Sequence, residues 1–176
     1  DALAARPDDD PIIMLNLLKF AQPDGEAAYR RYAKVSSKEV ARRGGGVAYA
    51  GDAVVPGDWD RIALVYYPRR AAFLDMQQSP AYQGAIPHRT EGLAARLLFA
   101  FRGTPATQLP DELSPVPDAG PDSVYVVNLL QYRGESGKAS YQQYGKVASN
   151  LIGELGGEVV FYLTADQAMV SDHAWD

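Results

Sequence analysis

One stretch of sequence occurs twice in this chain of 176 residues. Residues 16–20 read Asn-Leu-Leu-Lys-Phe, and residues 128–132 read Asn-Leu-Leu-Gln-Tyr. The offset of 112 residues pairs Tyr32 with Tyr144 and continues without a gap to two consecutive glycines in each copy. A repeat of this kind predicts that one supersecondary unit forms twice along the chain.

The first copy reads as a strand-helix-strand-strand-helix-strand unit, the ferredoxin-like split pattern. The expected elements are, in order, a buried strand over 11–20, a helix over 26–43 ended by glycines, strands over 47–55 and 61–67, a helical region over 69–96 and a strand over 97–101. Ser79-Pro80 is a typical helix start, whereas Pro87 should kink or restart the helix. In such a unit the strands lie side by side in the order 4-1-3-2.

The chain therefore divides into three parts. Residues 1–102 hold a complete unit, residues 103–122 form a linker with five prolines, and residues 123–176 hold a partial second copy of strand, helix and strand. That copy lacks the third strand, which should lie between its two strands, so backbone groups would be left unpaired. We expect the sequence to be a piece of a longer tandem protein; the alternative is a strand supplied by a swapped partner.

The Asn-Leu-Leu strand, the Tyr-x-x-Tyr helix and the Ser-Pro-x-Tyr…His-Arg helix together resemble the DUF1330 family. The resemblance covers residues 11–102 fully and 123–176 in part. It implies an α+β fold of the dimeric α+β barrel superfamily, beside the antibiotic-biosynthesis monooxygenase and NIPSNAP-like groups. Here that means two tandem ferredoxin-like βαββαβ units, the second truncated, in a homodimer or an intrachain pseudo-dimer. Fold alone does not supply an activity.

Composition excludes several classes of function. A net charge of −5 and a pI near 5.0 argue against a nucleic-acid or anionic-membrane partner, because both need a basic surface. The chain has no cysteine, which excludes disulfides and thiolate catalysis and is compatible with the cytoplasm, where we expect the protein. No apolar run approaches the length that crosses a bilayer.

Asn16 and Asn128 are the most unusual polar residues, because each lies inside an otherwise apolar run. A buried amide must find hydrogen-bond partners. The structural interpretation, which we favour, is an asparagine bonded to the backbone. The functional interpretation is a side chain that orients a ligand carbonyl or enolate, as the resemblance to cofactor-free monooxygenases implies.

His88 and Arg89 follow Pro87 in the second helical region. His88 could be a general base or, as a weaker hypothesis suggested by some barrels of the superfamily, an axial haem ligand. Arg89 could hold a carboxylate or a developing enolate. The structural alternative, which we favour, is a surface pair near a helix end. No His/Asp/Glu spacing resembles a metal site, so we expect no metal and no cofactor.

Four further residues are site candidates: Tyr66 as a catalytic residue, and Tyr32, Trp59 and Arg61, with Asn128, as ligand contacts. Tyr32 lies on the apolar stripe of its helix, where core packing is the default. Tyr66 is one of two tyrosines that end a strand, and alternation places one of them on each face. Trp59 and Arg61 flank the start of the third strand, where Asp60 and Arg61 could form an ion pair of a kind that is common and weak at the surface.

Two functions of different classes fit these observations. In the first, a metal-free enzyme of the monooxygenase or isomerase kind acts on a hydrophobic or aromatic substrate in a pocket lined by Asn16, Tyr66, His88 and Arg89. In the second, the domain is a non-catalytic ligand-binding or assembly module. The first predicts that the four side chains converge on one cavity, so a structure can separate the two.

Overall fold

The apolar run near the start of the sequence forms the central strand of a sheet in the computed structural model of the chain, which describes residues 9–103, 120 and 123–171. This strand, β1 (Ile12–Phe20), is buried along most of its length. The other elements of the first copy are α1 (Gly25–Ala41), β2 (Gly46–Asp52), β3 (Arg61–Tyr67), α2 (Arg70–Gln78), α3 (Pro80–Gly92) and β4 (Leu93–Gly103). They are followed by α4 (Gly134–Glu154) and β5 (Leu163–Ser171).

The sheet has the order β2-β3-β1-β4-β5, and every neighbouring pair is antiparallel. Read from β4, the first copy gives 4-1-3-2, as predicted for a ferredoxin-like unit. β1 and β3 are in register, with Ile12 opposite Tyr67 and Asn16 opposite Ala63. Since side chains alternate along a strand, this register decides which residues share a face.

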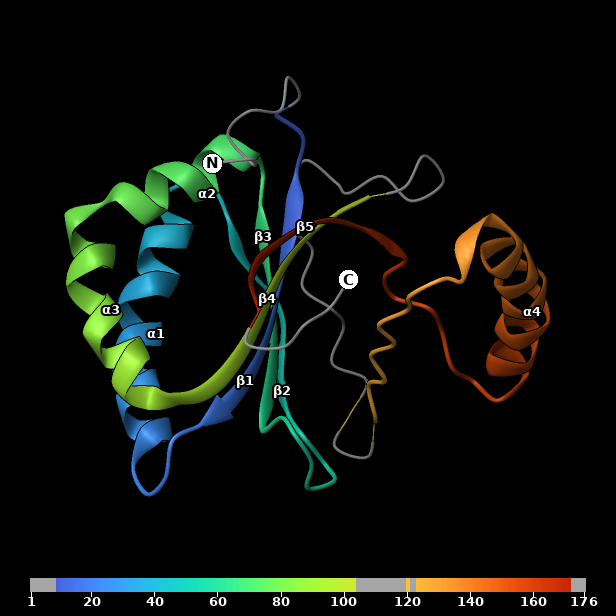
Figure 1. Ribbon diagram of the computed structural model, residues 1–176, viewed down its shortest axis with the longest axis horizontal. Coiled ribbons are helices and arrows are strands. Elements are labelled where there is room, and N and C mark those ends of the chain that lie inside the picture. Colours follow the sequence, from blue (N-terminus) through green and yellow to red (C-terminus); the bar gives the residue numbers. More distant parts are fainter. Residues whose placement is uncertain (1–8, 104–119, 121–122, 172–176) are drawn as a thin grey trace. The chain divides into compact units, whose positions relative to one another are not determined.

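The three helices α1, α2 and α3 cover the same face of the sheet (Figure 1). The core between them and the sheet contains Ile12 and Met14 from β1, together with Tyr67, Phe73 and Met76, all 3% exposed or less. Burying a large apolar side chain of this kind contributes roughly 1.5–3 kcal/mol. The helix layer is therefore anchored by packing on β1 and β3.

Ser79 separates α2 from α3 and starts the second of these helices. Its hydroxyl accepts from the backbone N–H of Tyr82 at 3.2 Å, and Pro80 occupies the first helical position. Pro87 was expected to kink or restart the helix; α3 does not restart there but continues through it to Gly92. Gln83, whose carbonyl the missing donor would have reached, is exposed, so water can replace the lost hydrogen bond.

A close approach between two glycines fixes the start of α1 against the end of α3. A Cβ on Gly25 would lie 2.6 Å from the carbonyl oxygen of Gly92, and one on Gly92 would lie 2.7 Å from the backbone nitrogen of Tyr29. Both distances are too short for real Cβ contacts, so the sequence needs glycine at both positions.

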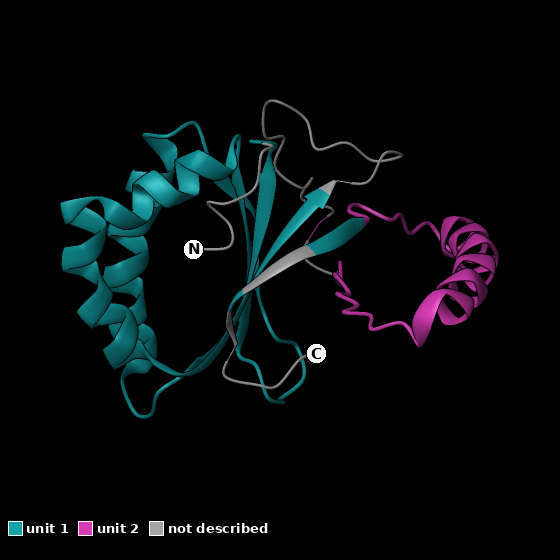
Figure 2. Cartoon of the chain, turned by 45° about the horizontal axis from the view of Figure 1, so that its top comes forward, with its two compact units in different colours: residues 1–116, 163–176 teal, residues 117–162 magenta. Residues whose placement is uncertain are grey.

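The chain separates into two compact units, residues 1–116 with 163–176 and residues 117–162 (Figure 2). The division differs from the predicted one, because β5 pairs with β4 and so joins the first unit. The strand expected within 123–132 is not formed, since those residues carry no regular secondary structure. Most of the predicted linker 103–122 lies outside the described residues. A second copy over 123–176 stays a prediction.

The repeat is nevertheless visible in local geometry. After α1 the N–H of Gly45 donates to the carbonyl of Val40 at 3.1 Å. After α4 the N–H of Gly157 donates to the carbonyl of Ile152 at 2.9 Å. Gly44 and Gly156, which precede these donors, have φ values of 76° and 79°. Both helices end in the left-handed turn that glycine favours, as the sequence predicted.

The aromatic contacts repeat in the same way. The ring centroids of Phe20 and Tyr29 lie 5.7 Å apart, and so do those of Tyr132 and Tyr141. The ring centroids of Tyr29 and Tyr32 lie 5.4 Å apart, and those of Tyr141 and Tyr144 lie 5.5 Å apart. Residues 132–157 thus share the ring spacings and the helix-ending turn of residues 20–45, although no residue of α4 is buried.

Candidate functional site

A cavity of about 370 Å³ lies between the sheet and the helices α1 and α3. We call it the tyrosine cavity, because its wall includes Tyr29 and Tyr32 from α1, Tyr67 from β3 and Tyr82 from α3. Its size is within the range of small-molecule sites, and most of the other lining side chains are apolar.

Helical spacing directs the tyrosines of α1 to this cavity. Tyr29 and Tyr32 are three residues apart, so they lie on one face of the helix. The ring of Tyr32 packs edge-on against that of Tyr82 with centroids 5.9 Å apart. The Tyr32 hydroxyl donates to the Tyr82 hydroxyl across 3.1 Å, which joins α1 to α3 inside the protein.

Arg89 completes this polar group from the next turns of α3. Its Nη1 donates to the Tyr82 hydroxyl at 3.0 Å, and its guanidinium lies 5.5 Å from the centroid of the Tyr32 ring. Its Nε is buried and has no hydrogen-bond partner. Within the described part of the chain, no carboxylate forms an ion pair with Arg89.

Burial controls the ionisation of the phenols. It raises the pKa of Tyr29 to about 12, chiefly through desolvation. Desolvation also raises the pKa values of Tyr32 and Tyr67 well above the ordinary tyrosine value, with the neighbouring Tyr82 adding to both shifts. At neutral pH these three hydroxyls are therefore protonated and can donate hydrogen bonds.

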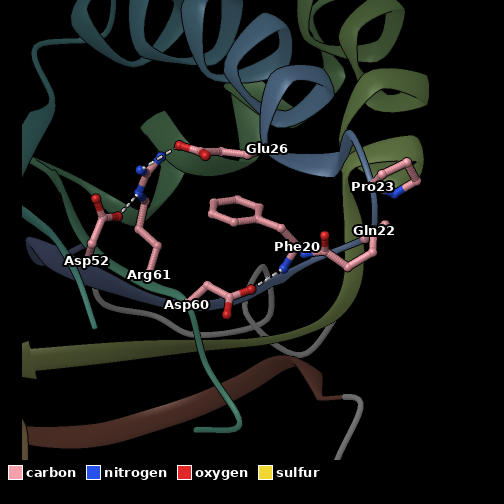
Figure 3. A pocket seen from close by; sticks show the side chains of 8 residues that line it. Phe20, Gln22, Pro23, Glu26, Asp52, Asp60 and Arg61 are labelled. Atoms are coloured by element: carbon pink, nitrogen blue, oxygen red, sulfur yellow. Dashed lines mark hydrogen bonds and ion pairs between the residues drawn. The ribbon is translucent and has the colours of Figure 1, made fainter. Parts of the chain in front are cut away.

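A second, charged pocket of about 360 Å³ lies where α1 begins (Figure 3). Arg61 bridges two carboxylates there, with Nε 2.6 Å from Asp52 and Nη2 3.0 Å from Glu26. Its guanidinium also lies 5.2 Å from the centroid of the Phe20 ring. Arg61 and Asp52 line both the charged pocket and the tyrosine cavity.

The pair suggested between Asp60 and Arg61 is not formed. Asp60 instead accepts from Lys19 Nζ at 2.8 Å and from the backbone N–H of Phe20 at 2.8 Å. Alternation along the chain explains the difference, because neighbouring residues of an extended segment point to opposite faces.

Four of the predicted site residues line the tyrosine cavity: Asn16, Tyr32, Arg61 and Arg89. The amide nitrogen of Asn16 donates to the backbone carbonyls of Met14 at 3.1 Å and Ala63 at 3.4 Å. This bonding agrees with the structural interpretation of Asn16.

The other four predicted residues do not line the cavity. Tyr66 is fully buried and lies opposite Ile13, on the sheet face away from the helices, so its neighbour Tyr67 occupies the cavity instead. The side chain of His88 is 44% exposed, with Nδ1 3.7 Å from Glu91. The predicted convergence of Asn16, Tyr66, His88 and Arg89 is therefore not observed.

Trp59 and Asn128 complete this comparison. Trp59 lies in the turn that precedes β3 and lines neither pocket. Asn128 is exposed and belongs to the second unit, where it is not part of a strand.

Tyr82 was not among the predicted site residues, although it lies beside Arg89. The spacing contained the signal, because residues seven apart lie two turns apart on one helix face. The Ser79-Pro80 start fixes where α3 begins, but the expected kink or restart at Pro87 hid the relation between Tyr82 and Arg89.

Among the described residues, no group of three or more His, Cys, Asp and Glu side chains is arranged to hold a metal ion. In that same part of the chain, no helix is both long and apolar enough to cross a membrane.

The fold and its strand order define a ferredoxin-like α+β protein. Residues 17–102 match the family model described as a domain of unknown function, DUF1330. A protein of unknown function from Rhodopseudomonas palustris, RPA0582, is 32% identical, with a TM-score of 0.50 over 56% of this chain and 86% of its own. The chain therefore belongs to the DUF1330 family.

Two more distant structures are similar. One is a dabb family protein with a ferredoxin-like fold from Mesorhizobium loti, which is 13% identical at a TM-score of 0.42 over 53% of this chain and 97% of its own. The other is a NIPSNAP domain protein from Burkholderia xenovorans, at 9% identity and a TM-score of 0.43 over 53% and 95%. No curated protein matches the sequence.

Proposed function

We propose that the tyrosine cavity binds a small hydrophobic molecule through an end group that accepts hydrogen bonds. The observation that supports this most is the cluster of Tyr32, Tyr82 and Arg89, whose polar atoms meet on the wall of an otherwise mainly apolar cavity. Ligand sites commonly combine an apolar lining with a few polar groups that fix orientation.

The free-energy cost of burying these polar groups supports a binding role. Core positions in a unit of this size are filled more favourably by apolar side chains, because a buried polar group must be fully hydrogen-bonded to be tolerated. The Nε of Arg89 is buried without a partner. A ligand acceptor would remove this penalty.

A cavity-filling substitution tests the proposal. Ala33 lines the cavity from α1, whereas Ala27 is exposed on the same helix. We expect the wild type to bind acetophenone, a neutral aromatic ketone, in calorimetric titrations. Ala33→Phe should abolish the heat of binding, and Ala27→Phe should retain it. No binding by the wild type, or equal binding by Ala33→Phe, would contradict a ligand site in this cavity.

A second candidate is catalysis without a cofactor, and the protonated tyrosines favour it. In enolisation a proton leaves the carbon next to a carbonyl, and the electron pair moves to the oxygen. Neutral phenols and a guanidinium stabilise the resulting enolate oxygen. Because Asp52, a carboxylate on the cavity wall, is paired with Arg61, water or buffer would take the proton.

Hydrogen exchange separates turnover from binding. In heavy water, an enolising site replaces the methyl hydrogens of bound acetophenone with deuterium, which proton NMR follows directly. Exchange faster than in buffer, and lost in Arg89→Gln, would support catalysis. If acetophenone binds but its methyl hydrogens exchange only at the rate seen in buffer, the protein is a binding module and not an enzyme for this reaction.

A further inference from the structure

Within the ranges that the structure describes, Arg89 lacks the carboxylate partner that several other arginines of the same unit have. Arg61 pairs with Glu26 and Asp52, Arg43 with Glu39 and Asp75, and Arg31 with Glu91. No described carboxylate pairs with Arg89, although its Nε is buried. A partly desolvated guanidinium without a counter-ion is costly, and an anion relieves that cost.

Counting hydrogens on the tyrosine pair gives a second, independent observation. Arg89 can only donate, so its bond to Tyr82 uses a lone pair of the Tyr82 oxygen. The hydroxyls of Tyr32 and Tyr82 carry two hydrogens, and the bond between them uses one. Whichever tyrosine donates, one phenolic hydrogen of the pair remains without an acceptor in the described structure.

The cluster therefore presents the unpartnered Nε–H of Arg89, one phenol O–H and a positive charge that no described carboxylate pairs with. A carboxylate has the matching properties, since it accepts through two oxygens and carries one negative charge. The rings of Tyr29, Tyr32 and Tyr82 can pack against a flat apolar group, so the ligand that carries the carboxylate should also carry such a group.

We propose that the ligand of the tyrosine cavity is a small aromatic or similarly flat monocarboxylate. Arg89 and the Tyr32–Tyr82 hydroxyl pair hold its carboxylate. This inference rests on the proposed function. Arg96 also lines the cavity, from β4, so a phosphate ester is the competing anion. A carboxylate is favoured because its single negative charge balances the single positive charge of Arg89, whereas a phosphate ester carries up to two negative charges.

Four ligands of similar shape test this assignment in calorimetric competition: acetophenone, benzamide, benzoate and phenyl phosphate. Benzoate should bind about ten-fold more tightly than benzamide, because hydrogen bonds to a charged acceptor are the stronger kind. Arg89→Gln should remove this preference while acetophenone or benzamide still binds, which shows that the variant is folded. Arg89→Lys should keep part of it.

Arg31→Gln is the matched control, since it removes the same charge from the exposed face of α1. It should leave the preference for benzoate unchanged. Equal binding of benzoate and benzamide, a preference that survives Arg89→Gln, or tighter binding of phenyl phosphate would overturn the carboxylate assignment. If none of the four ligands binds the wild type, the proposed function itself fails.

Discussion

The hydroxyl of Tyr32 donates to the hydroxyl of Tyr82 across 3.1 Å, and both side chains are less than a tenth exposed. The bond connects α1 to α3 at the wall of the tyrosine cavity. Arg89 donates to the same Tyr82 oxygen, so Tyr82 is the centre of the cluster and Tyr32 is one of its two donors.

Removing each hydroxyl should therefore have unequal effects on stability. Tyr32→Phe loses one buried hydrogen bond and should lower the free energy of unfolding by about 0.5–1.5 kcal/mol. Tyr82→Phe also deprives Arg89 of its acceptor and should cost more, roughly 1–3 kcal/mol. Urea unfolding measures both. Tyr144→Phe is the control, because this repeat counterpart of Tyr32 is 63% exposed and should change nothing. Equal losses for Tyr32→Phe and Tyr82→Phe would contradict the central place of Tyr82.

Two glycines of α3 should respond oppositely to the same substitution. Gly92→Ala would place a Cβ 2.7 Å from the backbone nitrogen of Tyr29 and should lower the free energy of unfolding by roughly 1–3 kcal/mol. Gly84→Ala meets nothing within 4 Å and should raise it by about 0.5–1 kcal/mol, through the better helix propensity of alanine. Thermal unfolding of the two variants is a sufficient measurement. A stabilised Gly92→Ala would mean that α1 and the end of α3 are further apart than the structure shows.

The sequence was sufficient for most of the first copy because its signals are local. The apolar run at β1, the glycine at the end of α1 and the Ser79-Pro80 start each act over a few residues, and the structure has them all. These signals also led to the 4-1-3-2 strand order, through the pattern of elements. The pairing of β5 with β4 was not predictable in the same way, since it depends on a contact distant in sequence.

The site was harder to predict than the fold. Alternation placed Tyr66 and Tyr67 on opposite faces, but only the register with β1 shows that Tyr67 is the one on the helix side. The pairing of Tyr82 with Arg89 depends on a helix that continues through Pro87, against the usual effect of proline. In both cases the sequence left open which side chains of an element share a face, and a difference of one residue can decide that.

The ion pairs of Arg61 should make stability depend on acid pH. Hydrogen bonds from Arg30 and Arg61 lower the pKa of Glu26 from 4.5, and the bond from Arg61 lowers the pKa of Asp52 from 3.8. A carboxyl whose pKa is depressed by folding stabilises the protein above its unfolded pKa and loses that contribution as the pH falls through the folded value. The stabilisation should thus be complete above about pH 5 and decline below pH 4.

The variant Arg61→Gln isolates this contribution. The difference in unfolding free energy between wild type and Arg61→Gln, measured in urea at a series of pH values, should shrink as the pH falls below 4. High salt at neutral pH should shrink it as well, because the pairs are partly exposed. The control Arg31→Gln keeps both pairs and should follow the wild type between pH 5 and pH 4. A difference independent of pH would mean that Arg61 acts through packing on Phe20 alone.

Alkaline pH should destabilise the protein, because burial raises the pKa values of the cavity tyrosines, whereas the ion pairs of Arg61 lower those of the carboxyls. Burial raises the pKa of Tyr29 from 10.0 to about 12, because folding favours the protonated phenol. That contribution is fully present below the unfolded pKa near 10 and is lost as the pH rises through the folded value. The free energy of unfolding should therefore fall between pH 10 and pH 12, and Tyr29→Phe should weaken this fall. Phenolate absorbance, recorded beside circular dichroism, should show some tyrosines ionising in the folded protein and the rest only as the helices unfold. Complete ionisation while the helical signal is intact would show that the cavity tyrosines are open to solvent.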